Sequence, residues 1–226
     1  MTSNEKKIKK NESKVDIKAL LIKGYMAYLL EHSKHPDSVY QFVKLHKLKE
    51  SDFYEYFGSF KALEQSIFSQ FFHHTHTLLN KNKEYADFDA QNKLTSFYYT
   101  FFDMLKANRS YVLLVLKPCQ GTLVDSPALK HLKKDFSSYI DSLNINTMSM
   151  KQEKLEEFQK KGSKTFFWQQ MLFILNFWLS DSSANFEKTD ILIEKAMTTS
   201  FQLMDIKPLK SLFDLGKFIL KERFQS

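Results

Sequence analysis

Two histidines spaced three residues apart are the clearest candidates for metal chemistry in this sequence. His73 and His76 share one face of an expected helix and would hold a metal ion if a third ligand came from elsewhere in the fold. No acidic or sulfur-containing partner lies nearby in the sequence, and exposed or half-buried histidines on an ordinary helix are several times more frequent. We therefore predict no metal site and no cofactor.

The motifs of common enzyme classes are absent from the sequence. It has no Gly-rich phosphate-binding loop, no nucleophile elbow and no His-Glu-x-x-His helix. The single cysteine, Cys119, excludes an internal disulfide framework and a cysteine-cluster metal site. Acidic residues are scattered without a recognisable pair, so we predict that the protein is not an enzyme.

The residue types in the sequence favour a binding pocket for a small apolar ligand. Ligand sites are concave and mostly apolar, with a few placed polar groups. Most aromatic residues in the C-terminal part should be core, but some of them are candidates to line a cavity instead. No spacing rule selects these candidates, which are Tyr98, Phe102, Tyr111, Cys119, Trp168, Gln169 and Asn176.

The elements that must position these residues are helices. The chain of 226 residues has only 5 Gly and 4 Pro, and 43% of its residues are hydrophobic, including 22 Phe. Because strand-rich folds need more turn residues than this, we predict an all-α protein with a large core. The charged N-terminus is no signal peptide, and the most apolar run, 166–179, is shorter than the ~20 residues of a membrane span. We expect a soluble cytoplasmic protein.

Apolar periodicity and helix-start residues divide the chain into an arm, a head and a body. Residues 1–14 form a flexible basic arm, residues 15–80 a helical head with its connecting helix, and residues 81–226 a helical body. Asp37 or Ser38, Ser59, Pro127 and Pro208 are the expected helix starts. The predicted helices are 15–30, 38–45, 49–57, 59–80, 89–107, 109–117, 127–143, 149–160, 163–180, 185–205 and 208–223.

The junction between the third and fourth of these helices carries a family resemblance. Its run Phe53-Tyr54-Glu55-Tyr56-Phe57-Gly58-Ser59, followed by Ala62-Leu63, resembles the helix-turn-helix signature of TetR transcriptional regulators over roughly residues 15–72. The segments Phe177-Trp178-Leu179 and Pro208-Leu209-Lys210 also look like the C-terminal domain of TetR-like proteins from Bacteroidetes. The resemblance implies a three-helix head whose second motif helix lies in the major groove of DNA.

This resemblance also implies which residues would contact DNA. Tyr54 stands where the family has a phosphate-contacting tyrosine, and Ser38 stands at a common hydroxyl contact. Our full set of candidates is Ser38, Lys49, Ser51, Tyr54 and Lys61. The lysines of the basic arm are further candidates for phosphate contacts, although a solubilising tail is at least as frequent a role for such an arm.

Several positions depart from the family pattern. The turn has His46-Lys47 where the family usually has Ala-Gly, and Phe60 takes the place of a phosphate-contacting lysine, with Lys61 one position later. The expected reading helix, 49–55, holds three acids against one lysine, and acids face the dense charge of the phosphates. The fold signature is therefore better preserved than the DNA-contact signature.

The helices 163–180 and 185–205 are apolar over wider arcs than one packing seam requires. Surplus apolar surface on paired helices is what a two-fold interface needs, and by resemblance these helices form the TetR dimer interface.

Two functions remain open. The first is a homodimeric, ligand-responsive TetR-like regulator that binds double-stranded DNA and a small apolar effector. The second is a TetR-fold lipid- or isoprenoid-binding protein that no longer binds an operator.

Overall fold

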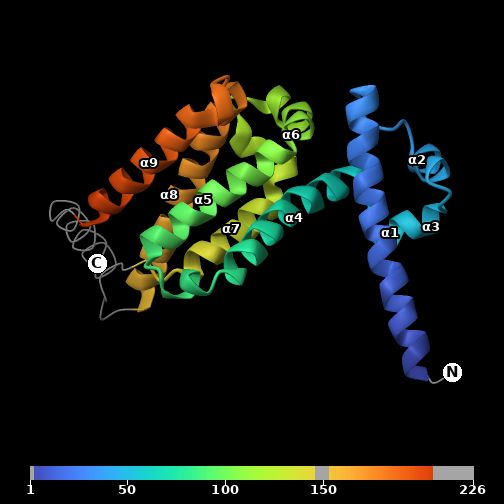
Figure 1. The fold of residues 1–226 in the computed structure, drawn as a ribbon, viewed down its shortest axis with the longest axis horizontal. Helices are drawn as coiled ribbons and strands as arrows, with labels where there is room; N and C mark the ends of the chain where they lie inside the picture. The colour runs from blue at the N-terminus through green and yellow to red at the C-terminus, as the bar shows by residue number, and fades with distance from the viewer. Residues whose placement is uncertain (1–2, 146–152, 206–226) are drawn as a thin grey trace, which may run out of the picture. The chain divides into compact units, whose positions relative to one another are not determined.

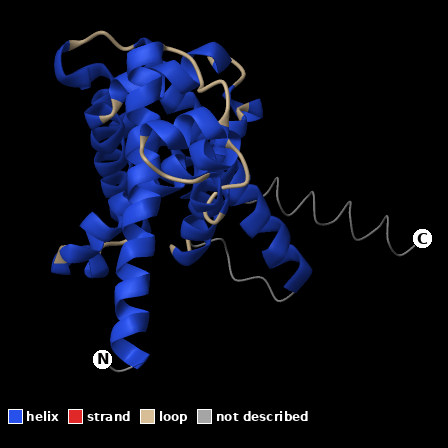
Figure 2. Cartoon of the chain, turned by 90° about the vertical axis from the view of Figure 1, so that its right-hand side faces the viewer, coloured by secondary structure: helices blue, strands red, loops and turns tan. Residues whose placement is uncertain are grey.

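The computed structural model describes residues 3–145 and 153–205, and all regular structure in these residues is helical (Figure 1, Figure 2). This confirms the predicted all-α fold. None of the described helices is both long enough and apolar enough to cross a lipid bilayer. The α-helices are α1 (Ser3–His32), α2 (Val39–Leu45), α3 (Glu50–Tyr54), α4 (Phe60–Lys81), α5 (Ala90–Ala107), α6 (Arg109–Leu116), α7 (Lys130–Ser142), α8 (Glu153–Ser180) and α9 (Glu187–Asp205). Short 3₁₀ helices are η1 (Lys83–Asp87), η2 (Lys117–Cys119), η3 (Leu123–Asp125), η4 (Pro127–Leu129) and η5 (Ala184–Phe186).

Helix starts inside the described residues follow the expected capping chemistry. Of the two candidates before α2, Ser38 is the cap, and its hydroxyl accepts a hydrogen bond from the Gln41 amide at 3.2 Å. The Ser59 hydroxyl accepts from the Ala62 amide at 3.2 Å and caps α4. Pro127 occupies the first turn of η4, where its missing N–H costs nothing.

Two helices are longer than the sequence predicts. Helix α1 begins at Ser3 rather than near residue 15, and α8 runs unbroken through Gly162 instead of forming the separate helices 149–160 and 163–180. A glycine in a helix interior costs only about 1 kcal/mol, and no cap or proline accompanies Gly162 to end the helix. The predicted helix 208–223 lies outside the described residues.

The chain divides into two compact units. The head unit comprises Met1–Phe71 and Leu105–Leu132, and the body unit comprises Phe72–Met104 and Lys133–Ser226. Helix α6 therefore belongs with α1, α2 and α3, whereas we expected it in the body. Helix α4 contributes its first half to the head unit and its second half to the body unit.

One aromatic cluster holds the head unit together. The Phe42 ring of α2 meets three others edge-on, with centroid distances of 6.1 Å to Tyr25, 6.3 Å to Phe53 and 5.5 Å to Phe60. Phe60 also stacks on Tyr25 at 5.4 Å. These contacts join four helices, α1 to α4, at a single point. Phe60, which replaces the lysine of the family pattern, is thus a structural residue that anchors α4 to the head.

The turn between α2 and α3 shows how the chain tolerates His46-Lys47 in place of Ala-Gly. Lys47 adopts a positive φ of 56°, a left-handed conformation that favours glycine. His46 packs its ring over Gly24 of α1, where a Cβ atom would overlap the imidazole. A glycine in α1 therefore makes room for the larger residue in the turn.

We predict that Lys47→Gly stabilises the protein. Relief of the left-handed strain should raise the free energy of unfolding by about 0.5–1 kcal/mol, after allowance for the greater freedom of glycine in the unfolded chain. Thermal and urea melts would measure the gain. Lys44→Gly is the matched control, because Lys44 lies within α2 and its replacement should destabilise by about 1 kcal/mol. A loss of stability in Lys47→Gly would contradict the prediction.

The body unit has a core built from large side chains of α5, α7, α8 and α9, which lie together in Figure 1. Phe97 of α5 stacks on Phe101 at 5.6 Å and contacts Phe136 of α7 at 5.8 Å. Trp178 of α8 packs on Phe102 at 6.1 Å. All of these side chains are buried. Most of the aromatic residues of α5 and the C-terminal half of α8 are therefore core, as predicted.

A buried carboxylate fixes the connection between α8 and α9. Asp181 accepts hydrogen bonds from the Thr189 amide (3.0 Å) and hydroxyl (2.6 Å) and from the Ser183 amide (2.9 Å) and hydroxyl (2.7 Å). Burial alone would raise the pKa of the Asp181 carboxyl, but these hydrogen bonds outweigh burial and lower the pKa to about 2. The ionised side chain therefore stabilises the start of α9.

Replacing this carboxylate should have a pH-dependent cost. We predict that Asp181→Asn lowers the free energy of unfolding at neutral pH by roughly 2 kcal/mol, because hydrogen bonds to a buried charge are lost. The folded-state pKa lies below the ordinary value of 3.8, so this stabilisation is complete above about pH 5 and disappears as the pH falls toward 2. Urea melts of wild type and variant from pH 7 to pH 3 should converge. The exposed Asp103→Asn is the control, and a gap that does not narrow at low pH would contradict the prediction.

Candidate functional site

Helices α2 and α3 of the head unit are joined by a tight turn. The turn is closed by hydrogen bonds from the amides of Lys47 to the Lys44 carbonyl (3.2 Å) and of Leu48 to the Val43 carbonyl (2.9 Å). At the start of α3, the Asp52 carboxylate accepts from the Lys49 amide at 2.9 Å. Helix α3 is short and ends at Tyr54, after which the chain turns into α4.

The acidic character of α3 has a partly structural origin. Asp52 is engaged in capping the helix, and negative side chains at a helix N-terminus are favoured by the helix dipole. Glu50 lies in the same first turn and is exposed. One of the three acids in the expected reading helix, Asp52, therefore has a structural role as part of the helix cap.

The five DNA-contact candidates all lie in the head unit, in three different settings. Ser38 is half-buried at the start of α2, where its hydroxyl is already used as the cap. Lys49 and Ser51 are exposed at the start of α3, and Tyr54 at its end is 55% exposed, with its ring edge-on to Phe53 at 5.5 Å. Lys61 is exposed on α4 and lines a pocket described below.

Sequence reasoning missed an aromatic and a basic group on α2. Tyr40 is 57% exposed, and the Lys44 ammonium lies 5.7 Å from the centre of its ring, a cation–π distance. The four-residue spacing puts both on one face of α2, opposite the buried Phe42 and Val43. The four-residue spacing of Tyr40 and Lys44 was the sequence signal that could have identified this pair. The apolar pattern places the residues between them, Phe42 and Val43, in the core.

The seven ligand candidates are divided between the two units. Tyr111 and Cys119 belong to the head unit, and the other five belong to the body unit. Gln169 is exposed on α8, and Asn176 is half-buried on the same helix.

Three of the body candidates lie in the buried core. The Tyr98 hydroxyl donates to the Phe167 carbonyl at 3.3 Å, and burial raises the pKa of Tyr98 well above its ordinary value. Phe102 stacks on Tyr98 at 6.3 Å. Trp168 is buried against Phe136 at 6.2 Å, and its Nε1–H has no hydrogen-bond acceptor among the described residues. A buried, unsatisfied donor of this kind is the feature of the body that best fits a ligand.

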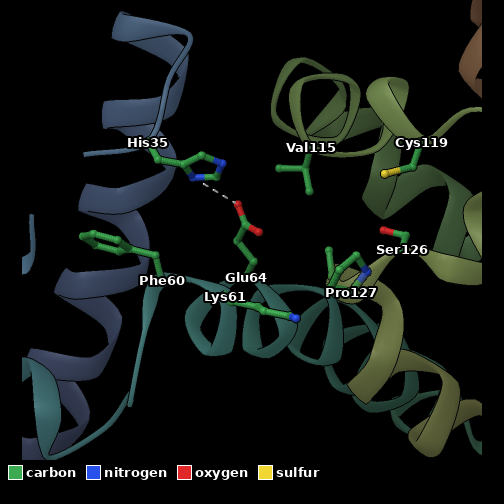
Figure 3. Close-up of a pocket in the computed structure, with 9 residues that line it drawn as sticks. His35, Phe60, Lys61, Glu64, Val115, Cys119, Ser126 and Pro127 are labelled. Carbon is green, nitrogen blue, oxygen red and sulfur yellow. Dashed lines mark ion pairs between the residues drawn. The ribbon is translucent and has the colours of Figure 1, made fainter. Parts of the chain in front are cut away.

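A pocket of about 350 Å³ lies within the head unit, between the loop that follows α1, the first turns of α4 and the segment from α6 to η4 (Figure 3). Its size falls in the range of small-molecule sites. Cys119 is the one ligand candidate that lines it. The lining residues are His35, Phe60, Lys61, Glu64, Val115, Cys119, Ser126, Pro127 and Ala128.

Two of the lining residues, His35 and Glu64, are hydrogen-bonded to the buried Tyr25, which does not itself line the pocket. The buried Tyr25 hydroxyl lies 2.8 Å from Glu64 Oε1 and 2.8 Å from His35 Nδ1, and the histidine nitrogen is 3.6 Å from the same carboxylate oxygen. Burial, followed by the charge of Glu64, raises the pKa of Tyr25 far above its ordinary value. Tyr25 therefore remains a protonated donor to Glu64.

The histidines considered as metal ligands have other partners. His73 Nε2 lies 3.5 Å from the Asp135 carboxylate, and His76 Nδ1 lies 2.9 Å from the Asn80 side-chain nitrogen. Within residues 3–145 and 153–205 there is no group of three potential ligands that would hold a metal ion.

Exposed apolar side chains follow one face of α8. Phe166, Phe173 and Phe177 recur at spacings of seven and four residues, and Phe173 is 60% exposed. Helix α9, which packs beside α8 through hydrogen bonds from the Gln170 side chain to the Ala196 carbonyl and the Ser200 hydroxyl, adds the exposed Ile191. Large exposed phenylalanines in a row are the surface expected of an interface.

Comparison with known proteins identifies the family of the C-terminal part of the chain. A family model described as "Tetracyclin repressor-like, C-terminal domain" matches residues 93–219, more than half of the chain. A search of curated proteins found no match. With its helix-turn-helix followed by this C-terminal domain, the chain belongs to the TetR family of regulators.

Proposed function

We propose that the protein is a homodimeric TetR regulator that binds double-stranded DNA through α2 and α3 and responds to a small apolar effector. The two short helices and their turn carry this proposal, because Lys49, which precedes α3, and Ser51 and Tyr54, which lie in it, are all exposed. Tyr40 and Lys44 on α2 add an aromatic and a basic group suited to the DNA backbone. A regulator of this kind acts in the cytoplasm and catalyses no reaction.

Two-fold symmetry is part of the proposal. A dimer places two copies of α3 at half-sites one helical turn of DNA apart, which multiplies the affinity of each head. The exposed phenylalanines of α8 and the apolar positions of α9 supply the surface for this interface. An effector in the body would act through its different affinity for the DNA-binding and non-binding arrangements of the two heads.

The experiment that tests this function is selection of bound fragments from a genomic DNA pool at low and moderate salt. A regulator should retain a few specific fragments at moderate salt, because base and shape contacts persist after phosphate contacts are screened. Binding that disappears at moderate salt and prefers no fragment would overturn the proposal.

A second function is favoured by two observations. Glu50 and Glu55 are exposed on or beside α3, where they oppose phosphate, and the buried Trp168 Nε1–H in the body lacks an acceptor among the described residues. A TetR-fold protein that binds a lipid or isoprenoid and no longer binds an operator would have both features. Native mass spectrometry and lipid extraction of the purified protein would test it. An empty body with no affinity for apolar ligands would exclude it.

A further inference from the structure

The pocket of the head unit has opposite walls of different chemistry. One wall carries His35 and the Glu64 carboxylate, and the other carries Ser126, Cys119 and Val115 (Figure 3). Pro127 and Ala128 add apolar surface on the second side. A ligand in this space would therefore meet a charged group at one end and mostly apolar groups at the other.

Two polar atoms at the pocket are left for a ligand. The Glu64 side chain is only 13% exposed, and its Oε1 accepts from Tyr25, but its Oε2 has no partner among the described residues. Ser126 is 7% exposed, and its hydroxyl, which points into the space, makes no hydrogen bond to any described residue. The carboxylate and the hydroxyl both face the pocket, so each can form a hydrogen bond to a molecule that enters it.

The charges decide which class of molecule fits. Glu64 is the most buried charged group at the pocket, whereas Lys61 and His35 are exposed and keep contact with water. A poorly hydrated carboxylate interacts most favourably with a hydrogen-bonding cation, and the Ser126 hydroxyl offers such a cation a second acceptor. Lys61 has no ion-pair partner among the described residues, and would remain available to a second, anionic group of the same ligand.

We propose that this pocket binds a small organic ammonium compound, whose charged group pairs with Glu64 and Ser126 and whose apolar part contacts Val115, Pro127 and Ala128. This site lies in the head unit and is distinct from the aromatic core of the body. Its regulatory consequence rests on the proposed function. Because Glu64 on α4 is linked through Tyr25 to His35, three residues before the cap of α2, a ligand that engages Glu64 would change how α2 is held.

Cys119 provides a local probe for the test. It is the single cysteine of the chain and lines the pocket, so its alkylation by iodoacetamide reports on this site alone. We expect phenethylamine to slow the alkylation and to bind in calorimetry, and phenylalanine, which also carries an ammonium group, to do the same. N-acetylphenethylamine and 3-phenylpropionate have the same apolar part without the ammonium group and should give no protection.

Variants distinguish the contributions of Glu64 and Lys61 of α4 to ligand binding. Glu64→Gln keeps the shape of the side chain and should weaken phenethylamine binding about tenfold or more. Lys61→Ala removes a like charge and should leave this binding unchanged or tighten it. Glu31→Gln, at an exposed position of α1, is the matched control. Because Glu64→Gln could also disturb folding, thermal melts and the alkylation rate without ligand should accompany it, and Ser126→Ala gives an independent loss of affinity.

Each outcome has a definite meaning. Protection by both amines that is lost in Glu64→Gln supports the site, and protection by 3-phenylpropionate alone, or calorimetric binding without protection of Cys119, overturns it. Binding to DNA is measured separately on the full chain. Specific DNA binding with no amine binding rejects this site and leaves the proposed function intact. Amine binding without specific DNA binding rejects the proposed function and leaves the site intact.

Discussion

Phe173→Asp should convert the proposed dimer to a monomer. Phe173 is 60% exposed on α8, in line with the exposed Phe166 and Phe177, so a side chain of this size is left in water unless a partner covers it. In a two-fold interface each substitution occurs twice. Burial of one phenylalanine contributes about 2 kcal/mol, so two lost contacts alone raise the dissociation constant roughly a thousandfold, and two buried carboxylates raise it further.

The experiment is sedimentation or light scattering over a range of protein concentrations. Because Phe173 is already exposed in the single chain, the variant should keep its helical content and most of its melting temperature as a monomer. Val124→Asp is the matched control, since Val124 is 52% exposed and lies in η3 of the head unit. A Phe173→Asp protein that remains dimeric at nanomolar concentration would place the interface elsewhere.

Local signals in the sequence predicted much of the fold. Ser38, Ser59 and Pro127 start helices because a side-chain cap or a fixed φ acts within one turn, independently of the rest of the chain. The predicted helix bounds were wrong where the local signal was weak. The sequence predicts separate helices 149–160 and 163–180, but α8 runs through Gly162, whose propensity cost of about 1 kcal/mol is too small to end a helix on its own.

Sites were harder to predict, because they depend on tertiary neighbours. The pattern of α4 places Glu64 between buried positions without showing that Tyr25 would meet it from α1, or that Ser126 would lie opposite it. The sequence places Tyr111 and Cys119 within the predicted body, residues 81–226, whereas the structure places them in the head unit. Phe60 was read as a lost DNA contact, and its packing on Phe42 shows instead what it contributes to the fold.

Tyr54→Phe should reduce operator affinity strongly while leaving the salt dependence of binding unchanged. The Tyr54 side chain is 55% exposed at the end of α3, and its ring is held edge-on by Phe53, so the substitution removes only the hydroxyl from an ordered surface. A hydrogen bond to a phosphate is worth about 1.5 kcal/mol or more, and the dimer makes it at both half-sites. The expected loss is therefore roughly a hundredfold in affinity for the selected fragment.

Lys49→Ala is the informative partner to this variant, because it removes a charge rather than a neutral donor. Each lysine that contacts a phosphate releases about 0.9 counterion, so loss of Lys49 from both half-sites should reduce the slope of log K against log salt by about 1.8. Fluorescence anisotropy at several salt concentrations measures affinity and slope together. If α3 faces DNA, both variants will lose affinity, but only Lys49→Ala will change the slope of log K against log salt. If neither variant changes affinity while the wild type still binds specific fragments, the helix-turn-helix is not the reading element, and the basic residues of α1 become the next surface to test.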